Sequence, residues 1–147
     1  MTSDSKTIFL AEDDDDDTMF FLEALREINC TLEIITSRDG VELMEKLDAY
    51  VPPIPKVLFL DLNIPKKNGV HCLIEIKRTD KLRNIPIVIL STSHNLEHIR
   101  TTYYLGANYY MIKPYTFSQL ANGIKKILQL NLSNHGHISI DEFVFRP

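Results

Sequence analysis

The chain has 147 residues, of which 44% are hydrophobic and 24% charged, and its formal net charge is −4. This length and composition predict one globular domain with a hydrophobic core of its own. An acidic chain without a stripe of lysine and arginine is a poor partner for nucleic acid, and no apolar run approaches the ~20 residues that span a membrane.

Strand-like and helix-like segments alternate five times along the chain. The expected strands are the short apolar runs at residues 7–11, 32–36, 56–61, 87–90 and 108–112. The expected helices are the amphipathic segments at about 15–29, 41–49, 70–78, 96–104 and 117–130. Strands that alternate with helices at this spacing form right-handed βαβ units. The sequence therefore predicts an α/β fold with a doubly wound, five-stranded parallel sheet.

Two of the expected strands run directly into carboxylates. The first leads into Glu12 and Asp13, and the third ends on Asp61. Ligand sites of such sheets lie outside the carboxyl ends of the strands, so neighbouring strands would bring these three side chains together. Two carboxylates ~4 Å apart repel each other by about 4 kcal/mol at an effective dielectric of 20. The cluster therefore requires raised pKa values or a bound cation, and oxygen ligands favour Mg²⁺.

Further residues that could take part in binding or catalysis follow the third, fourth and fifth expected strands. The residues of interest are Glu12, Asp13, Asp61, Pro65, Gly69, Ser91, Lys113 and Pro114. With these marks the chain, from residue 6 to about 131, resembles the receiver domain of bacterial two-component response regulators. The resemblance is to stand-alone regulators of the chemotaxis and phytochrome-associated types. It implies a flavodoxin-like sheet with the strand order 2-1-3-4-5.

The resemblance implies a role for each acidic residue. Asp61 would be the phosphoacceptor, a carboxylate nucleophile that holds the phosphoryl group as an acyl phosphate. Glu12, Asp13, Asp61 and the backbone carbonyl of Asn63 would hold Mg²⁺. The alternative for Asp61 is a structural or Ca²⁺-binding carboxylate.

Two further side chains would contact the phosphoryl oxygens. Ser91 would supply a hydroxyl and Lys113 a compact positive charge. The alternatives are a turn hydroxyl for Ser91 and a resting salt bridge to Asp61 for Lys113. By the same resemblance Ser91 and Tyr110 would form a switch, whereas a half-buried tyrosine on an edge strand is the plain alternative. The resemblance also implies a cis peptide between Lys113 and Pro114.

The aspartates at residues 14–17 extend the acidic pair into a run of five. Aspartate at a helix N-terminus caps free N–H groups and stabilises the helix dipole. Helix capping is therefore the expected role of this run, with tuning of the metal site by Asp14 as a second role.

The expected function is that of a single-domain response regulator in a phosphorelay. A sensor histidine kinase or a phosphotransfer protein would donate the phosphoryl group, and an unknown downstream protein would read the state. A haloacid-dehalogenase-like phosphatase is the enzymatic alternative, but it needs a second aspartate where this chain has Asn63. An unphosphorylated binding module is the third possibility. Cys30 and Cys72 lack metal or redox spacing, which favours thiols in the cytoplasm.

The C-terminal tail, residues 132–147, is too short for an output domain. Its stretch at 138–145 is more apolar and aromatic than a disordered end usually is. We expect this stretch to pack on the helix 117–130, on a twin subunit in a homodimer, or on both. Simple docking within the chain is an equally favoured alternative.

Overall fold

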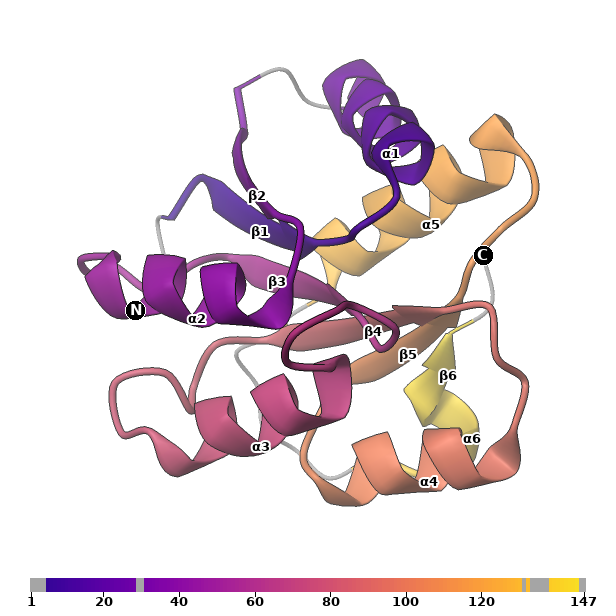
Figure 1. Cartoon of the computed structure of the whole chain (residues 1–147). Coiled ribbons are helices and arrows are strands. Elements are labelled where there is room, and N and C mark those ends of the chain that lie inside the picture. Colours follow the sequence, from indigo (N-terminus) through magenta and orange to yellow (C-terminus); the bar gives the residue numbers. More distant parts are fainter. Residues whose placement is uncertain (1–4, 29–30, 131, 133–137, 146–147) are drawn as a thin grey trace.

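A computed structural model describes residues 5–28, 31–130, 132 and 138–145. The elements in chain order are β1 (Thr7–Ala11), α1 (Asp15–Ile28), β2 (Glu33–Ser37), α2 (Gly40–Ala49), β3 (Val57–Asp61), α3 (Gly69–Arg78), β4 (Ile87–Ser91), α4 (Leu96–Tyr104), β5 (Tyr109–Ile112), α5 (Phe117–Gln129), α6 (Ile140–Phe143) and β6 (Val144–Phe145). The strands form one parallel sheet in the order β2-β1-β3-β4-β5-β6 (Figure 1). The five predicted strands and their order are confirmed, and β6 is an addition that the sequence pattern did not predict.

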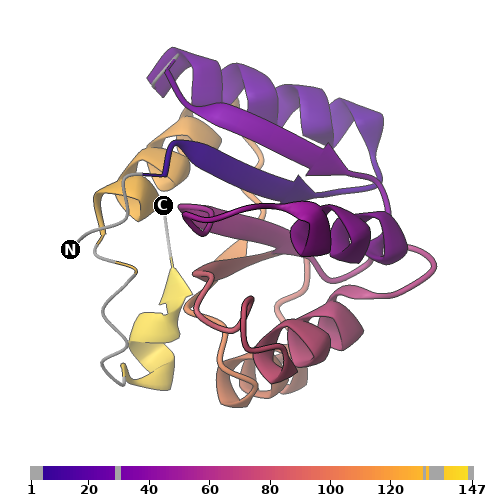
Figure 2. The same ribbon diagram turned by 90° about the vertical axis from the view of Figure 1, so that its left-hand side faces the viewer.

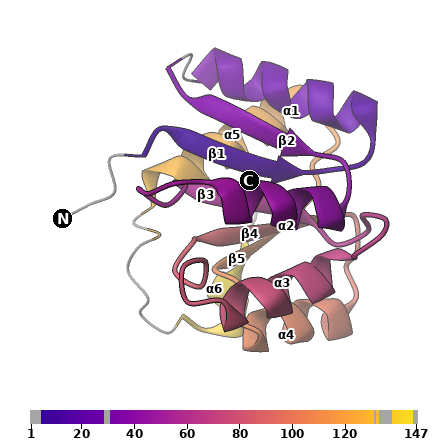
Figure 3. The same cartoon turned by 60° about the vertical axis from the view of Figure 1, so that its left-hand side comes forward.

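Helices cover both faces of the sheet. Figures 2 and 3 show α1 and α5 on one face and α2, α3 and α4 on the other. Every residue of β1, β3 and β4 is buried, because these central strands have helices on both sides. Two apolar clusters, one on each face, make up the core of this doubly wound fold. No helix of the described residues is long and apolar enough to cross a membrane.

Polar side chains define where the helices begin. Asp39, Asn68 and Thr116 each accept a hydrogen bond from a backbone N–H in the first turn of α2, α3 and α5. These caps satisfy donors that have no partner inside the helix. Because α3 begins so soon after β3, the Asn68 cap also fixes the loop that follows Asp61. Cys72 in α3 is a buried free thiol, as expected, and Cys30 lies outside the described residues.

The tail docks within its own chain. β6 pairs in parallel with β5, and α6 lies against α4 (Figure 1). Phe143 is fully buried, and its ring centroid lies 5.2 Å from that of Tyr103 and 6.2 Å from that of Tyr110. Docking within the chain, one of the alternatives considered from the sequence, is therefore confirmed. The segment lies against α4 and β5, and its Phe145 also packs on the apolar cluster that includes Leu120 and Ile124 of α5. Packing on a twin subunit stays a prediction. The edge of β5 offers unpaired backbone groups, and the segment satisfies them by adding a strand.

Candidate functional site

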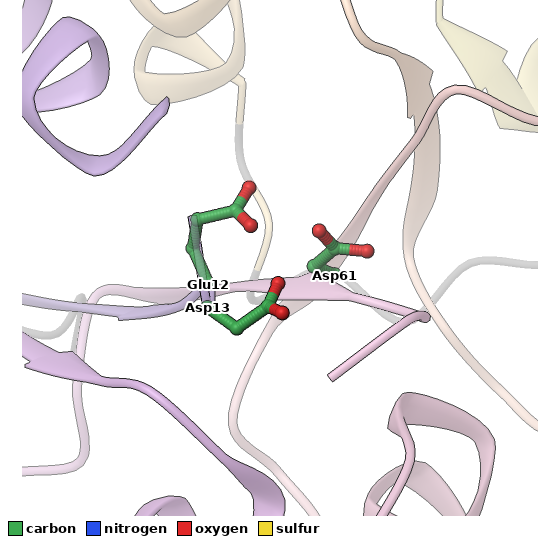
Figure 4. A group of neighbouring side chains, drawn as sticks. All are labelled: Glu12, Asp13 and Asp61. Carbon is green, nitrogen blue, oxygen red and sulfur yellow. The ribbon is translucent and has the colours of Figure 1, made fainter. Parts of the chain in front are cut away.

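Three carboxylates meet at the carboxyl ends of β1 and β3. These strands are neighbours, with Ala11 opposite Leu60, so the residues that follow lie side by side. Glu12, Asp13 and Asp61 each offer an oxygen, and these oxygens lie within 4.8 Å of one another. Figure 4 shows the three side chains gathered at this edge of the sheet. The convergence predicted from strand order is confirmed.

Lys113 inserts a positive charge into this cluster from the end of β5. Its Nζ lies 2.6 Å from Glu12 Oε1 and 2.8 Å from Asp61 Oδ2. The Lys113 backbone N–H donates to the carbonyl of Ser91 at 2.8 Å, which ties the residue to the neighbouring strand. The resting salt bridge to Asp61, one of the two roles considered for this lysine, is therefore present.

Burial and mutual charge shift the pKa values of these groups. Burial raises the pKa of Glu12 to about 7, the charge of Asp61 adds to this rise, and Lys113 opposes it. Burial alone would lower the pKa of Lys113, but its hydrogen bonds to Asp61 and Glu12 outweigh burial and raise it. One lysine thus only partly neutralises the carboxylates, and a site with this excess of negative charge attracts a cation.

The residues present fit a divalent cation. Carboxylate oxygens are the ligands that Mg²⁺ prefers, and Glu12, Asp13 and Asp61 provide them from two adjacent strands. The backbone N–H of Asn63 donates to Asp61 Oδ1 at 2.9 Å, which orients the carboxylate. A cavity of about 450 Å³, lined by Asp13, Asn63 and Ser91 among others, lies beside the cluster. The geometry agrees with the Mg²⁺ cofactor expected from the sequence.

Gly69 allows the backbone of α3 to approach Asp61 closely. Its N–H donates to the carbonyl of Leu62 at 3.0 Å. A Cβ at this position would lie 2.5 Å from the carbonyl oxygen of Asp61, closer than real side chains come. The glycine eight residues after Asp61 is therefore a steric requirement for the position of that carboxylate.

The two predicted switch residues meet at the loop after β4. Ser91 is buried, and its Oγ accepts a hydrogen bond from the backbone N–H of Ser93 at 3.0 Å. Tyr110 is fully buried, and its hydroxyl donates to the carbonyl of Ser93 at 2.9 Å. The structure thus shows the turn-hydroxyl arrangement of Ser91. The alternative of a half-buried tyrosine on an edge strand is wrong, because β6 covers β5 and Phe143 packs on Tyr110.

The expected cis peptide between Lys113 and Pro114 is not found. Among the described residues the one cis peptide bond joins Pro52 and Pro53. The trans form is the default for bonds that precede proline, in about 95% of folded cases. With this trans bond Lys113 Nζ already reaches the carboxylates, so the cis expectation is wrong.

Asp17 is a contact of Lys113 that the sequence pattern did not single out. Its Oδ2 lies 3.3 Å from Lys113 Nζ, which makes it a third carboxylate on the same ammonium. Its neighbours have other roles, because Asp14 Oδ1 accepts from the N–H of Asp17 and Asp15 pairs with Arg38. Five consecutive aspartates look alike in sequence, and only the orientation of α1 distinguishes them.

Comparison with known proteins agrees with this site. The family model of the response regulator receiver domain matches residues 8–125. The chain therefore belongs to the response regulator receiver domain family. The predicted function class, a response regulator of two-component signalling, is confirmed.

Similar proteins include regulators of phytochrome signalling. Response regulator Rcp1 of Synechocystis sp. is 36% identical over 126 residues, which cover 83% of this chain and 86% of Rcp1. The crystal structure of the phosphorylated cyanobacterial phytochrome response regulator RcpA matches with a TM-score of 0.76 and 40% identity, covering 84% of this chain and 91% of that one. The Mn²⁺-bound form of Rcp1 matches with a TM-score of 0.73 and 33% identity, covering 90% and 99%.

Proposed function

We propose that Asp61 accepts a phosphoryl group from a phosphohistidine of a sensor kinase or a phosphotransfer protein. One observation carries this proposal: Asp61 is only 4% exposed, yet each of its two carboxylate oxygens is held by a hydrogen-bond donor. Asn63 holds Oδ1 and Lys113 holds Oδ2. A carboxylate fixed in this way is an oriented nucleophile beside a space that admits a phosphoryl group.

The transfer needs no further protein reactant. An Asp61 oxygen attacks the phosphorus, the new O–P bond forms, and the P–N bond of the donor histidine breaks. The electron pair stays on the donor imidazole nitrogen, which takes a proton from solvent. Glu12, Asp13, Asp61 and the Asn63 carbonyl would hold Mg²⁺, which would supply positive charge to stabilise the transferred group. Lys113 supplies a second positive charge.

Phosphorylation would change the loop after β4. The phosphoryl group adds about −1.5 to −2 charge and three acceptor oxygens. Ser91 Oγ then exchanges its bond with the Ser93 N–H for a bond to a phosphoryl oxygen. Tyr110 donates a hydrogen bond to the carbonyl of the same Ser93, so this exchange would change the position of the group that holds the Tyr110 hydroxyl. Phe143 packs on the Tyr110 ring and would respond to that change. Partner proteins would read the state from α4, β5 and the docked segment 138–145.

The remaining assignments follow from the same proposal. Residues 6–131 act as the receiver domain, and residues 132–147 add a short tail. The chain acts on no separate substrate, because Asn63 stands where a dehalogenase-like phosphatase needs its acid. A cytoplasmic location suits a partner kinase that uses ATP.

The homodimer stays a prediction. Light scattering of the protein before and after phosphorylation tests it.

The proposal predicts one phosphoryl group per chain. Incubation with acetyl phosphate and Mg²⁺ should add one phosphoryl mass to the intact protein, and chelation of the metal should prevent the addition. Asp61→Asn should remain unlabelled, because an amide is no nucleophile here, whereas Asp16→Asn serves as a control and should be labelled normally. Labelling that persists in Asp61→Asn would contradict the assignment.

A further inference from the structure

The ammonium of Lys113 has three carboxylate partners of different kinds. Glu12 and Asp61 are buried and belong to the cluster that fits a divalent cation. Asp17 lies 3.3 Å from the same Nζ, but its side chain is 53% exposed and it stands on α1, outside that cluster. A lysine ammonium has three N–H donors, so the three carboxylates together can use all of them.

The position of Asp17 is set by the start of α1. Asp14 Oδ1 accepts a hydrogen bond from the Asp17 N–H at 2.9 Å, and the Asp14 carbonyl accepts from the Thr18 N–H at 3.0 Å. These bonds fix the first turn and aim Asp17 at the end of β5. Asp17 and Lys113 also border a small cavity of about 60 Å³ with largely apolar walls. Asp17 is half exposed and Lys113 largely buried, so solvent screens this ion pair in part.

Two of the three partners are engaged by other groups during the proposed reaction. A cation at the cluster competes with the lysine for the oxygens of Glu12 and Asp61. A phosphoryl group on Asp61 converts that carboxylate into an acyl phosphate. Asp17 takes part in neither event, so it keeps its charge and its contact with the ammonium throughout.

We propose that Asp17 is a positioning residue that holds Lys113 at the site when Glu12 and Asp61 are engaged by the cation and the phosphoryl group. Without Asp17 the long lysine side chain loses its one lasting anchor and turns toward solvent part of the time. The ammonium is then less often in place to stabilise the incoming phosphoryl oxygens. This inference rests on the proposed function, because the phosphoryl group on Asp61 defines what Lys113 is positioned for.

A general effect of negative surface charge is the competing explanation. Asp16 allows the two to be separated, because it is exposed, lies one residue away and forms no ion pair within the described part of the chain. Asp16→Asn and Asp17→Asn remove the same charge from the same turn of helix. A long-range field effect would make the two variants alike, whereas a contact effect makes them differ.

The test measures the rate of phosphorylation by acetyl phosphate at saturating Mg²⁺. Asp17→Asn should slow the reaction about three- to fivefold, as expected for loss of a partly exposed ion pair, and Asp16→Asn should leave it unchanged. Asp17→Glu should retain most of the rate, because it keeps the carboxylate. In a Lys113→Ala background, Asp17→Asn should cause no further loss, since its partner is gone.

A second readout addresses the lysine directly. NMR of the phosphorylated protein should show faster exchange of the Lys113 ammonium protons in Asp17→Asn than in the wild type and in Asp16→Asn. Equal exchange in all three proteins, equal rate losses for the two asparagine variants, or a loss that persists without Lys113 would overturn the inference. Labelling of the wild type on Asp61 would stand apart from these results, so a failure here is distinguishable from a failure of the proposed function.

Discussion

Hydrogen bonds from Asn63 and Lys113 hold the carboxylate of Asp61 in one orientation. Its carboxylate is buried, yet each oxygen has a hydrogen-bond donor, so the cost of burying the charge is offset locally. For Glu12 the interaction with Lys113 does not offset the cost of burying the charge, and burial raises its pKa to about 7. The site thus keeps unneutralised acidic groups next to one lysine, which is a poor arrangement for stability and a good one for binding a cation.

At the residue scale, Asp13 should contribute to metal binding far more than its acidic neighbours. Asp13→Asn should weaken Mg²⁺ binding about tenfold or more, because it removes a charged oxygen from the three-carboxylate cluster. Asp16→Asn should change the affinity little, since Asp16 lies outside that cluster. Calorimetric titration of both variants at one pH and salt concentration measures the difference. Equal losses would mean that the acidic run attracts ions diffusely.

The sequence predicted the residues of the cluster better than their supporting contacts. Glu12, Asp13 and Asp61 were predictable because strand ends in a parallel sheet meet at one edge. Asp17 was not, because its role depends on the rotation of α1 about its axis. The complete burial of Tyr110 was not predictable either, because the segment that covers it lies more than 30 residues later in the chain.

At the element scale, the docked tail is the part of the fold that a substitution can test most simply. Phe143→Ala removes a fully buried ring from between α4 and β5. Loss of a buried phenylalanine typically costs about 3–5 kcal/mol. A terminal segment can undock while the rest stays folded, so the loss is limited to the free energy of docking. We expect a decrease in unfolding free energy of about 1–3 kcal/mol.

Urea unfolding of Phe143→Ala measures this decrease, and Phe145→Ala is the matched control. Phe145 is only partly buried, beside Tyr109 with ring centroids 6.2 Å apart, so its loss should be smaller. Hydrogen exchange should also show weaker protection of the β5 amides in Phe143→Ala. A Phe143→Ala protein with the stability and protection of the wild type would contradict docking of the tail.

The boundaries of the main elements were predictable to within about one or two residues, because apolar periodicity and capping residues mark them. α6 and β6 were not. Their lengths of four and two residues are too short to show a period of their own. The apolar character of residues 138–145 indicated that this stretch packs somewhere, but its partner surface depends on tertiary structure.

At the scale of the whole molecule, the sheet order explains why distant residues act together. β1 and β3 place the carboxylates, β4 places Ser91, and β5 places Lys113, all at one edge. Ser93, in the loop after β4, is hydrogen-bonded to both Ser91 and Tyr110, and Phe143 of the tail packs on Tyr110. A change of charge at Asp61 could therefore reach the surface of α4 and β5 through the contacts of Ser91, Ser93 and Tyr110.

The most direct measurement identifies the chemical form and position of the modification. Borohydride reduces an acyl phosphate to an alcohol, so a phosphorylated aspartate becomes homoserine and can be located by mass spectrometry of peptides. After treatment with acetyl phosphate and Mg²⁺, the account predicts homoserine at position 61 and at no other aspartate. Homoserine elsewhere, or a phosphoryl group retained on a histidine with Asp61 unmodified, would contradict the account.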